Sequence, residues 1–244
     1  MTDQNERHAH DDDSPQGIVQ QAEQNLNALR TKLNNRESES TLQINLLKKC
    51  TRPKPEHIAK IPMDSASSNT LKRNIGLEII SNIADTLQDL GISKFAVDAI
   101  DQEGLSVLPL DMFEEVRDWF DAIPSKGSID SFDGSSNVVN YVKNLVSVID
   151  IPGNEEEESE EVWIFRSWGP QKLMRKGVPL VRLHGDYALR EKPDILHVDN
   201  GVDFFVYRRM IFIINYAQFE RATNFREVTR RLAERSLGEI FEKL

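Results

Sequence analysis

Four short runs of β-branched and aromatic residues recur in the last third of this chain, and they constrain its fold more than any other feature. The runs cover residues 163–165, 178–181, 204–207 and 211–214. Runs of this composition are typical of β-strands. Because only Arg208, Arg209 and Met210 separate the last two runs, we predict a tight antiparallel hairpin. Arginine suits such a turn poorly, so we expect these two arginines to serve a purpose other than backbone geometry.

The first part of the chain has the spacing of helices instead. Over residues 17–33, apolar residues recur every three or four positions, at Val19, Ala22, Leu26, Leu29 and Leu33. The pattern predicts a helix that packs on its own domain or on a partner, since an isolated helix of this length is marginal in water. A second series begins near Thr70 and ends before Gly91, which predicts another helix. Residues 34–70, with several prolines and serines, are interpreted as a linker.

Further patterns complete the expected architecture. Residues 95–97 and 105–108 are predicted to form a hairpin, and Asp111 is expected to cap a helix that runs through Phe120. Asn224, with Glu227 three positions later, predicts the start of a final helix. We therefore predict an α+β fold, with a helix-hairpin N-terminal part and an antiparallel-sheet C-terminal part that ends in a terminal helix.

Composition divides the chain into five expected segments. They are a disordered tail (1–16), a helical and linker segment (17–69), an acidic α+β part (70–154), an acidic loop (155–161) and a basic part of antiparallel β-structure plus helix (162–244). The single Cys50 excludes a disulfide scaffold and a cysteine-built zinc site. The sequence has no run of about 18 apolar residues, as a membrane helix needs, and no signal-peptide pattern at its start. We expect a cytoplasmic protein.

Charge is distributed unevenly along the chain, whose formal net charge is −10. Residues 71–161 hold 20 acidic and 6 basic residues, whereas residues 162–244 hold 10 acidic and 15 basic residues. The overall negative charge argues against a nucleic-acid partner only for the middle of the chain. The asymmetry favours different partners for different surfaces. The glutamate run at 155–161 is interpreted as a solvated loop, or alternatively as an acidic lid that competes with nucleic acid.

Arginine outnumbers lysine in the basic part, which suits paired hydrogen bonds to phosphate. We predict that nucleic acid is bound by Lys172, Arg175, Lys176, Arg208, Arg209, Arg226, Arg230, Arg231 and Arg235. An alternative is internal pairing, because Glu227 and Glu234 can reach several of these arginines along the final helix. We expect no catalytic residue, metal or cofactor. A metal-dependent nuclease built on acidic residues between Asp186 and Asp203 is kept as an alternative, although their spacing matches no metal-nuclease pattern well.

The order of elements in the C-terminal third resembles a known domain. The residues that carry the resemblance are Asp203 before the hairpin, Ile213 and Asn215 in and after its second strand, and the pair Phe219-Glu220. This pattern is similar to the domain of the B component of the Kiwa anti-phage defence system, over about residues 160–235. Two features depart from it: a Gly-containing turn is expected where Arg208-Arg209 stand, and the family is expected to continue beyond the final helix.

The resemblance implies a cytoplasmic, non-catalytic DNA-binding effector that works beside a membrane-embedded partner subunit, at the inner face of the membrane. We also expect a homo-oligomer. Our first hypothesis is therefore a DNA-binding defence protein that holds phosphates through its C-terminal arginines. The rivals are the metal-dependent nuclease and a protein-interaction module without nucleic-acid binding, in which the helix at 17–33 serves assembly.

Overall fold

A computed structural model describes residues 14–48, 56–75, 83, 92–94, 105–123, 142–154, 157–167, 180–183, 186–189, 201–223, 225–226, 228–231 and 234. Its helical elements are α1 (Pro15–Asn35), α2 (Ser65–Lys72), the short 3-10 helix η2 (Leu110–Met112), α4 (Glu114–Asp121) and α7 (Tyr216–Thr223). Its strands are β1 (Thr41–Lys48), β2 (Glu56–Lys60), β3 (Ile92–Lys94), β4 (Leu105–Pro109), β5 (Val142–Ile151), β6 (Glu160–Ser167), β7 (Leu180–Leu183), β8 (Asp186–Leu189), β9 (Phe204–Tyr207) and β10 (Met210–Ile213). The predicted α+β class is confirmed.

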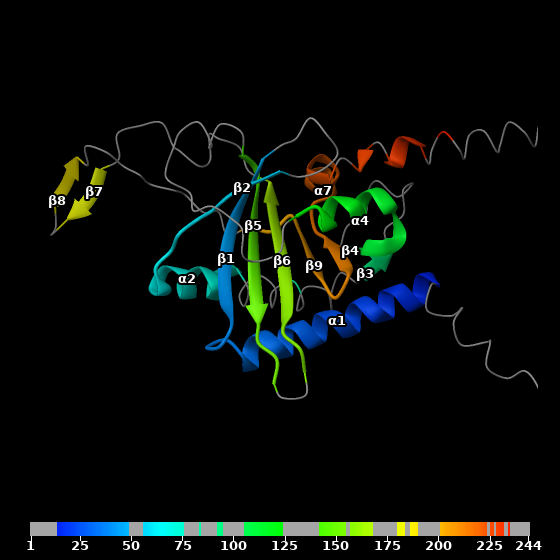
Figure 1. The fold of residues 1–244 in the computed structure, drawn as a ribbon, viewed down its shortest axis with the longest axis horizontal. Coiled ribbons are helices and arrows are strands. Elements are labelled where there is room, and N and C mark those ends of the chain that lie inside the picture. The colour runs from blue at the N-terminus through cyan, green and yellow to red at the C-terminus, as the bar shows by residue number, and fades with distance from the viewer. Residues whose placement is uncertain are drawn as a thin grey trace, which may run out of the picture.

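Eight of these strands form one sheet, in the order β2-β1-β5-β6-β9-β10-β4-β3 (Figure 1). All neighbours are antiparallel except β3 and β4, which run parallel. Strands from the first 60 residues and from the last third therefore share a single sheet. β7 and β8 pair only with each other, as a separate two-stranded sheet.

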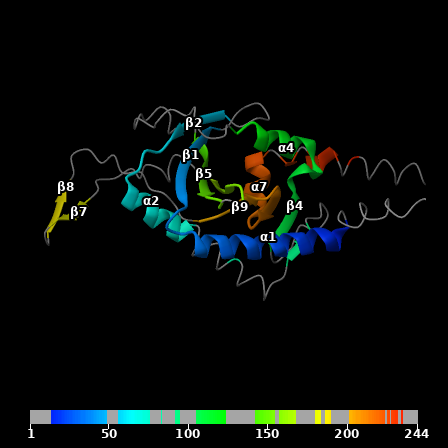
Figure 2. The same cartoon turned by 60° about the horizontal axis from the view of Figure 1, so that its bottom comes forward.

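Alternation along the strands divides the core into two layers, one on each face of the sheet. On one face, Ile44, Ile164 and Phe212 pack with the apolar stripe of α1. On the other face, Phe165, Phe204 and Ile211 pack with residues of α4 and α7. Figure 2 shows α1 beneath the sheet, with α4 and α7 on the opposite side. The sheet is thus covered by helices on both faces.

The helix predicted for residues 17–33 is confirmed as α1, which Ser14 caps by accepting a hydrogen bond from the Gly17 amide at 3.0 Å. Residues 15–16, which were included in the expected tail, form the first turn of this helix. Ala22, Leu26, Leu29 and Leu33 are buried against the sheet. The apolar stripe of α1 therefore packs against the sheet of its own chain.

The interpretation of residues 34–70 as a linker is wrong. β1 and β2 belong to the main sheet, and β1 lies between β2 and β5. Leu42, Ile44 and Leu46 alternate with polar residues, which is the period of a strand that has one apolar face. α2 begins at Ser65, where Asp64 caps it, and ends at Lys72, so it overlaps only the start of the helix expected from Thr70. Residues 76–82 and 84–90 of that expected helix lie outside the described residues.

Two other local predictions also change. Residues 95–97, expected as one arm of a hairpin, lie outside the described residues, and β3 just before them runs parallel to β4. Asp111 does not cap a helix, because α4 begins at Glu114 after Phe113, and Asp111 lies in η2. Asn224 and Glu227 lie outside the part that the structure describes. Instead, α7 begins directly after β10, where no helix was predicted.

Truncation of Leu29 should destabilise the protein, because its side chain is 0% exposed between α1 and the sheet. We expect Leu29→Ala to lower the free energy of unfolding by about 2–5 kcal/mol, through lost burial and the cavity left behind. The exposed Gln24→Ala on the same helix should change it by less than about 0.5 kcal/mol. Urea denaturation measures both. Equal values for the two variants would show that α1 is not docked.

Candidate functional site

The candidate site is the group of arginines around the β9–β10 turn and after α7. The turn itself consists of two residues, and both have a left-handed backbone conformation. Tyr207 and Met210 are partners in the register, so Arg208 and Arg209 alone form the turn, and the predicted hairpin is confirmed. Their φ angles are 48° and 56°, in the left-handed region. Both positions of such a turn favour Asn or Gly, and residues with a side chain pay a conformational cost there. The structure must offset this cost elsewhere.

Each of the two guanidinium groups is held by a carboxylate. Arg208 Nη2 donates to Glu160 Oε1 at 2.8 Å, and its Nε donates to the same oxygen at 3.2 Å. Arg209 Nε donates to Asp111 Oδ2 at 2.7 Å, and its Nη2 pairs with Asp111 Oδ1, so that the contact is bidentate. The hydrogen bond from Arg209 lowers the pKa of Asp111 below its usual value of 3.8. The arginines thus link the turn to β6 on one side and to η2 on the other.

The arginines beyond α7 are also paired. Arg231 Nη2 contacts Glu115 Oε1 at the start of α4, and Arg230 Nε lies 3.8 Å from Glu234 Oε1. The second contact is the internal pairing that was considered as an alternative. Arg226 is exposed on the same segment. Lys172, Arg175, Lys176 and Arg235 lie outside the described residues, so the structure brings together only part of the predicted set.

Exposure limits the strength of these ion pairs. The side chains of Arg208, Arg209, Arg230 and Arg231 are 40%, 57%, 64% and 53% exposed. Ion pairs between exposed groups contribute about 0.2–1 kcal/mol each, because water screens the charges and two long side chains lose freedom. The guanidinium groups therefore remain accessible to an anion that offers a stronger contact.

Glu160 is the centre of a larger network. Besides Arg208, its carboxylate accepts a hydrogen bond from the Tyr207 hydroxyl and lies 3.1 Å from Lys32 Nζ of α1. Lys32 also pairs with Glu157 at 3.0 Å. Burial alone would raise the pKa of Glu160, but hydrogen bonds from Arg208, Tyr207 and Lys32 together lower it below 4.5. The end of the acidic run is thus tied to α1 and to the hairpin.

This lowered pKa predicts a pH dependence of stability. A carboxylate with a lower pKa in the folded state stabilises the protein above pH 4.5, and the contribution is lost as the pH falls through the folded-state pKa. We expect the difference in urea midpoint between the wild type and Glu160→Gln to shrink as the pH falls from about 6 to 3. Glu158→Gln, at an exposed neighbour, is the control. A difference that stays constant over this range would contradict the network.

A second carboxylate, Asp203, is 1% exposed and joins three elements. Its Oδ1 accepts a hydrogen bond from Arg166 Nη1 at 2.8 Å, and its Oδ2 accepts one from the Ser167 amide at 2.6 Å. Its backbone carbonyl accepts from the amides of Ile214 and Asn215 at 3.0 and 2.8 Å. Asp203 therefore fastens the end of β6 and the segment before α7 to the start of β9.

The other residues of the predicted family pattern also stabilise this region. Asn215 Oδ1 accepts from the Gln218 amide at 3.2 Å and so caps α7. Phe219 is fully buried, with its ring centroid 5.2 Å from that of Phe204. Ile213 is buried as well, whereas Glu220 accepts a hydrogen bond from the Tyr216 hydroxyl at 3.3 Å. The pattern thus marks packing and capping around the hairpin.

Removal of the Asp203 carboxylate should lower the free energy of unfolding substantially. Asp203→Ala removes the ion pair between the 1% exposed Asp203 carboxylate and the Arg166 guanidinium, which is 24% exposed, and we expect a loss of about 3 kcal/mol in the free energy of unfolding. Asp203→Asn, which keeps one acceptor oxygen, should lose less. The measurement is urea denaturation, with Asp118→Ala, at an exposed position of α4, as the control. A midpoint unchanged in Asp203→Ala would rule out this role.

Asp203 is one of the acidic residues on which the nuclease alternative depends. Its carboxylate is buried and used by Arg166 and the Ser167 amide, so it does not face a substrate. Asp186 lies in β8, and Glu191, Asp194 and Asp199 are outside the described residues. No group of three or more His, Cys, Asp or Glu side chains that could hold a metal ion occurs among the residues that the structure describes.

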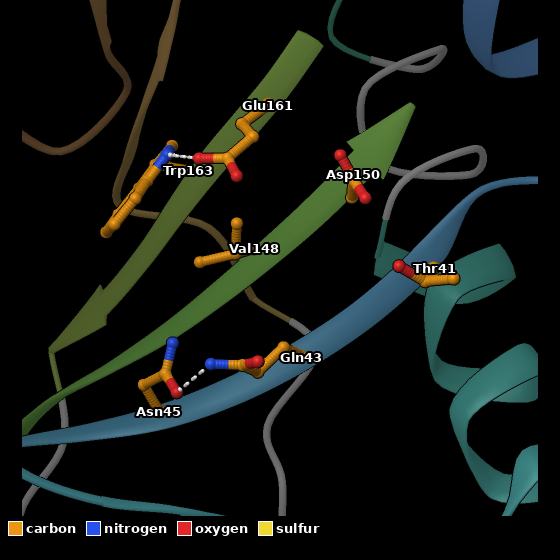
Figure 3. A pocket seen from close by; sticks show the side chains of 7 residues that line it. All are labelled: Thr41, Gln43, Asn45, Val148, Asp150, Glu161 and Trp163. Carbon is orange, nitrogen blue, oxygen red and sulfur yellow. Dashed lines mark hydrogen bonds between the residues drawn. The ribbon is translucent and has the colours of Figure 1, made fainter. Parts of the chain in front are cut away.

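A shallow hollow of about 50 Å³ lies on the sheet where β1, β5 and β6 run side by side (Figure 3). It is lined by Thr41, Gln43, Asn45, Val148, Asp150, Glu161 and Trp163. Trp163 Nε1 donates to Glu161 at 3.0 Å, and Gln43 donates to Asn45 at 2.7 Å. Small-molecule sites usually occupy about 300–1,000 Å³. This hollow has room for a few water molecules or the end of one side chain.

The fold and the site together define an α+β protein with a mixed sheet between helical layers and exposed arginines held by carboxylates. The model of the family described as Kiwa protein KwaB-like matches residues 154–244, which confirms the predicted resemblance over this part of the chain. The family implies a component of the Kiwa anti-phage defence system, which works with partner proteins. No curated protein and no solved structure matches the chain.

The structure adds the carboxylate partners of these arginines, which the sequence did not identify, namely Asp111, Glu115 and Glu160. Asp111 was expected as a helix cap and Glu160 as part of a loop. A signal for such partners was present in Arg208-Arg209, two arginines in a turn that disfavours them, but that signal does not say which carboxylates lie nearby. Within the described ranges, no helix is both long and apolar enough to cross a membrane.

Proposed function

We propose that this protein is a DNA-binding component of a Kiwa anti-phage defence system, and that it holds phosphate groups through arginines of its C-terminal third. The observation that carries the proposal is the exposure of all five described arginines of the predicted set: Arg208, Arg209, Arg226, Arg230 and Arg231. An arginine fork fits a phosphate as well as it fits a carboxylate. Weak exposed ion pairs can therefore be exchanged for contacts to a nucleic-acid backbone.

Two further observations support binding without cleavage. The KwaB-like match covers the hairpin and the arginines that follow α7, so the candidate contacts lie in the family domain. The carboxylate of Asp203, which the nuclease alternative needs, accepts hydrogen bonds from Arg166 and from the Ser167 amide. The proposal includes a homo-oligomer and a membrane-embedded partner subunit, which would hold the protein at the inner face of the membrane.

DNA affinity should fall with salt, and reversal of two arginines should weaken this dependence. For duplex DNA, log K decreases with log salt concentration by about 0.9 for each phosphate contacted. We expect Arg230→Glu/Arg231→Glu to bind more weakly and to reduce the slope by about 2. The measurement is fluorescence anisotropy with a labelled duplex and a labelled single strand at several salt concentrations.

Arg36→Glu/Arg73→Glu is the matched control, because it changes the net charge equally, and these two arginines pair with Glu39 and Glu37 in the first part of the chain. It should change the slope little. A wild-type slope near zero, or equal effects of the two double variants, would overturn the proposal. Parallel gels with and without Mg²⁺ test the nuclease alternative, because metal-dependent cleavage would appear there as shortened DNA. Co-purification of a partner without any DNA affinity would favour the interaction module.

A further inference from the structure

Three arginines of the predicted nucleic-acid set are paired with carboxylates from the acidic middle of the chain, residues 71–161. Arg208 pairs with Glu160, Arg209 with Asp111 and Arg231 with Glu115. The partners in each pair are between 48 and 116 residues apart in the sequence, so the pairs exist only in the folded protein. Acidic residues of the middle segment, which holds 20 of the 40 in the chain, thus lie against the basic surface.

The geometry of these contacts is the geometry that phosphate would use. Arg209 directs Nε and Nη2 at the two carboxylate oxygens of Asp111, whereas Arg208 directs the same two atoms at one oxygen, Oε1, of Glu160. The two-oxygen contact of Arg209 has the form that a guanidinium group takes with either carboxylate or phosphate. While the carboxylate is in place, the donors are occupied and its negative charge repels a second anion. Carboxylate and phosphate therefore compete for the same atoms.

Asp111 and Glu115 are four residues apart, in η2 and at the start of α4. They hold arginines from two different places, the hairpin turn and the segment after α7. The backbone is held here as well, because the Leu110 amide donates to the Arg209 carbonyl at 2.8 Å. One short acidic segment therefore lies against both groups of basic residues.

We propose that Asp111, Glu115 and Glu160 are intramolecular competitors of phosphate, which restrain DNA binding by occupying Arg209, Arg231 and Arg208. This inference rests on the proposed function and adds its regulation. A single phosphate must displace one carboxylate to make one new contact, so the exchange contributes little binding free energy. A polyanion that engages several arginines at once makes the later contacts intramolecular, so it displaces the carboxylates together. The device selects polymeric nucleic acid over free nucleotides.

The experiment compares two triple variants of the full chain with equal net charge. Asp111→Asn/Glu115→Gln/Glu160→Gln removes the competitors. The control Glu114→Gln/Asp118→Asn/Glu158→Gln removes neighbouring acids, of which Glu114 and Asp118 contact Arg117 instead of the proposed binding arginines. Fluorescence anisotropy with a labelled DNA duplex at about 50 mM salt measures the affinity, and far-UV circular dichroism verifies folding. We expect the first triple variant to bind about tenfold more tightly than the wild type, and the control less than about twofold.

A double-mutant cycle separates release of an arginine from a general change in charge. Glu115→Gln should tighten binding by about two- to fivefold in the wild type, whereas it should have no such effect in an Arg231→Ala background. Equal tightening in both backgrounds would overturn the inference, since repulsion alone would then explain the effect. Glu114→Gln, one position away, serves as the control for this step.

The outcomes distinguish this inference from the proposed function. If the wild type binds DNA with a clear salt dependence and the two triple variants bind equally, the inference is overturned and DNA binding stands. If neither the wild type nor either triple variant binds duplex at 50 mM salt, the proposed function fails and the inference fails with it. Tighter binding by the first triple variant alone supports both.

Discussion

The buried carboxylate of Asp203 is the contact on which the arrangement around the hairpin depends. It neutralises Arg166, accepts the Ser167 amide, and lies next to the point where the chain enters β9. The carbonyl of the same residue accepts both amides that follow β10. The hairpin is thereby fastened at its open end to β6 and to the start of α7. Arg208 and Arg209 lie at the closed end of the same hairpin. The contacts of Asp203 at the open end therefore help to fix the position of the hairpin that carries them.

The uneven charge of the chain becomes a set of contacts in the folded protein. The acidic middle supplies Asp111, Glu115 and Glu160, and the basic third supplies the arginines that they hold. These pairs are exposed and individually weak, so each contributes little to the stability of the fold. A structural role and the proposed restraining role are compatible here, because the hydrogen bonds that link the turn to β6 and η2 also occupy its guanidinium groups.

Local patterns predicted the elements whose secondary structure follows from the spacing of apolar residues close together in the sequence. The hairpin and α1 follow from period two and from a spacing of three to four, and both are present. The interpretation of residues 34–70 as a linker was wrong because prolines and serines outweighed the short alternation at Leu42, Ile44 and Leu46. α7 was not predicted because only Ile214 and its cap Asn215 separate it from β10, within a pattern that was interpreted only as a family signature.

The sequence by itself determined the α+β class, the two-residue turn, the amphipathic stripe of α1 and the concentration of arginines after residue 161. The turn and the stripe depend on residues that are close together in the sequence, and the α+β class and the arginine content depend on composition and spacing along the chain. Only the tertiary structure decided that β1 and β2 join the same sheet as β9 and β10, and that Asp111, Glu115 and Glu160 hold Arg209, Arg231 and Arg208. Pairing between distant segments depends on how strands are ordered in the sheet. Local spacing carries no record of that order.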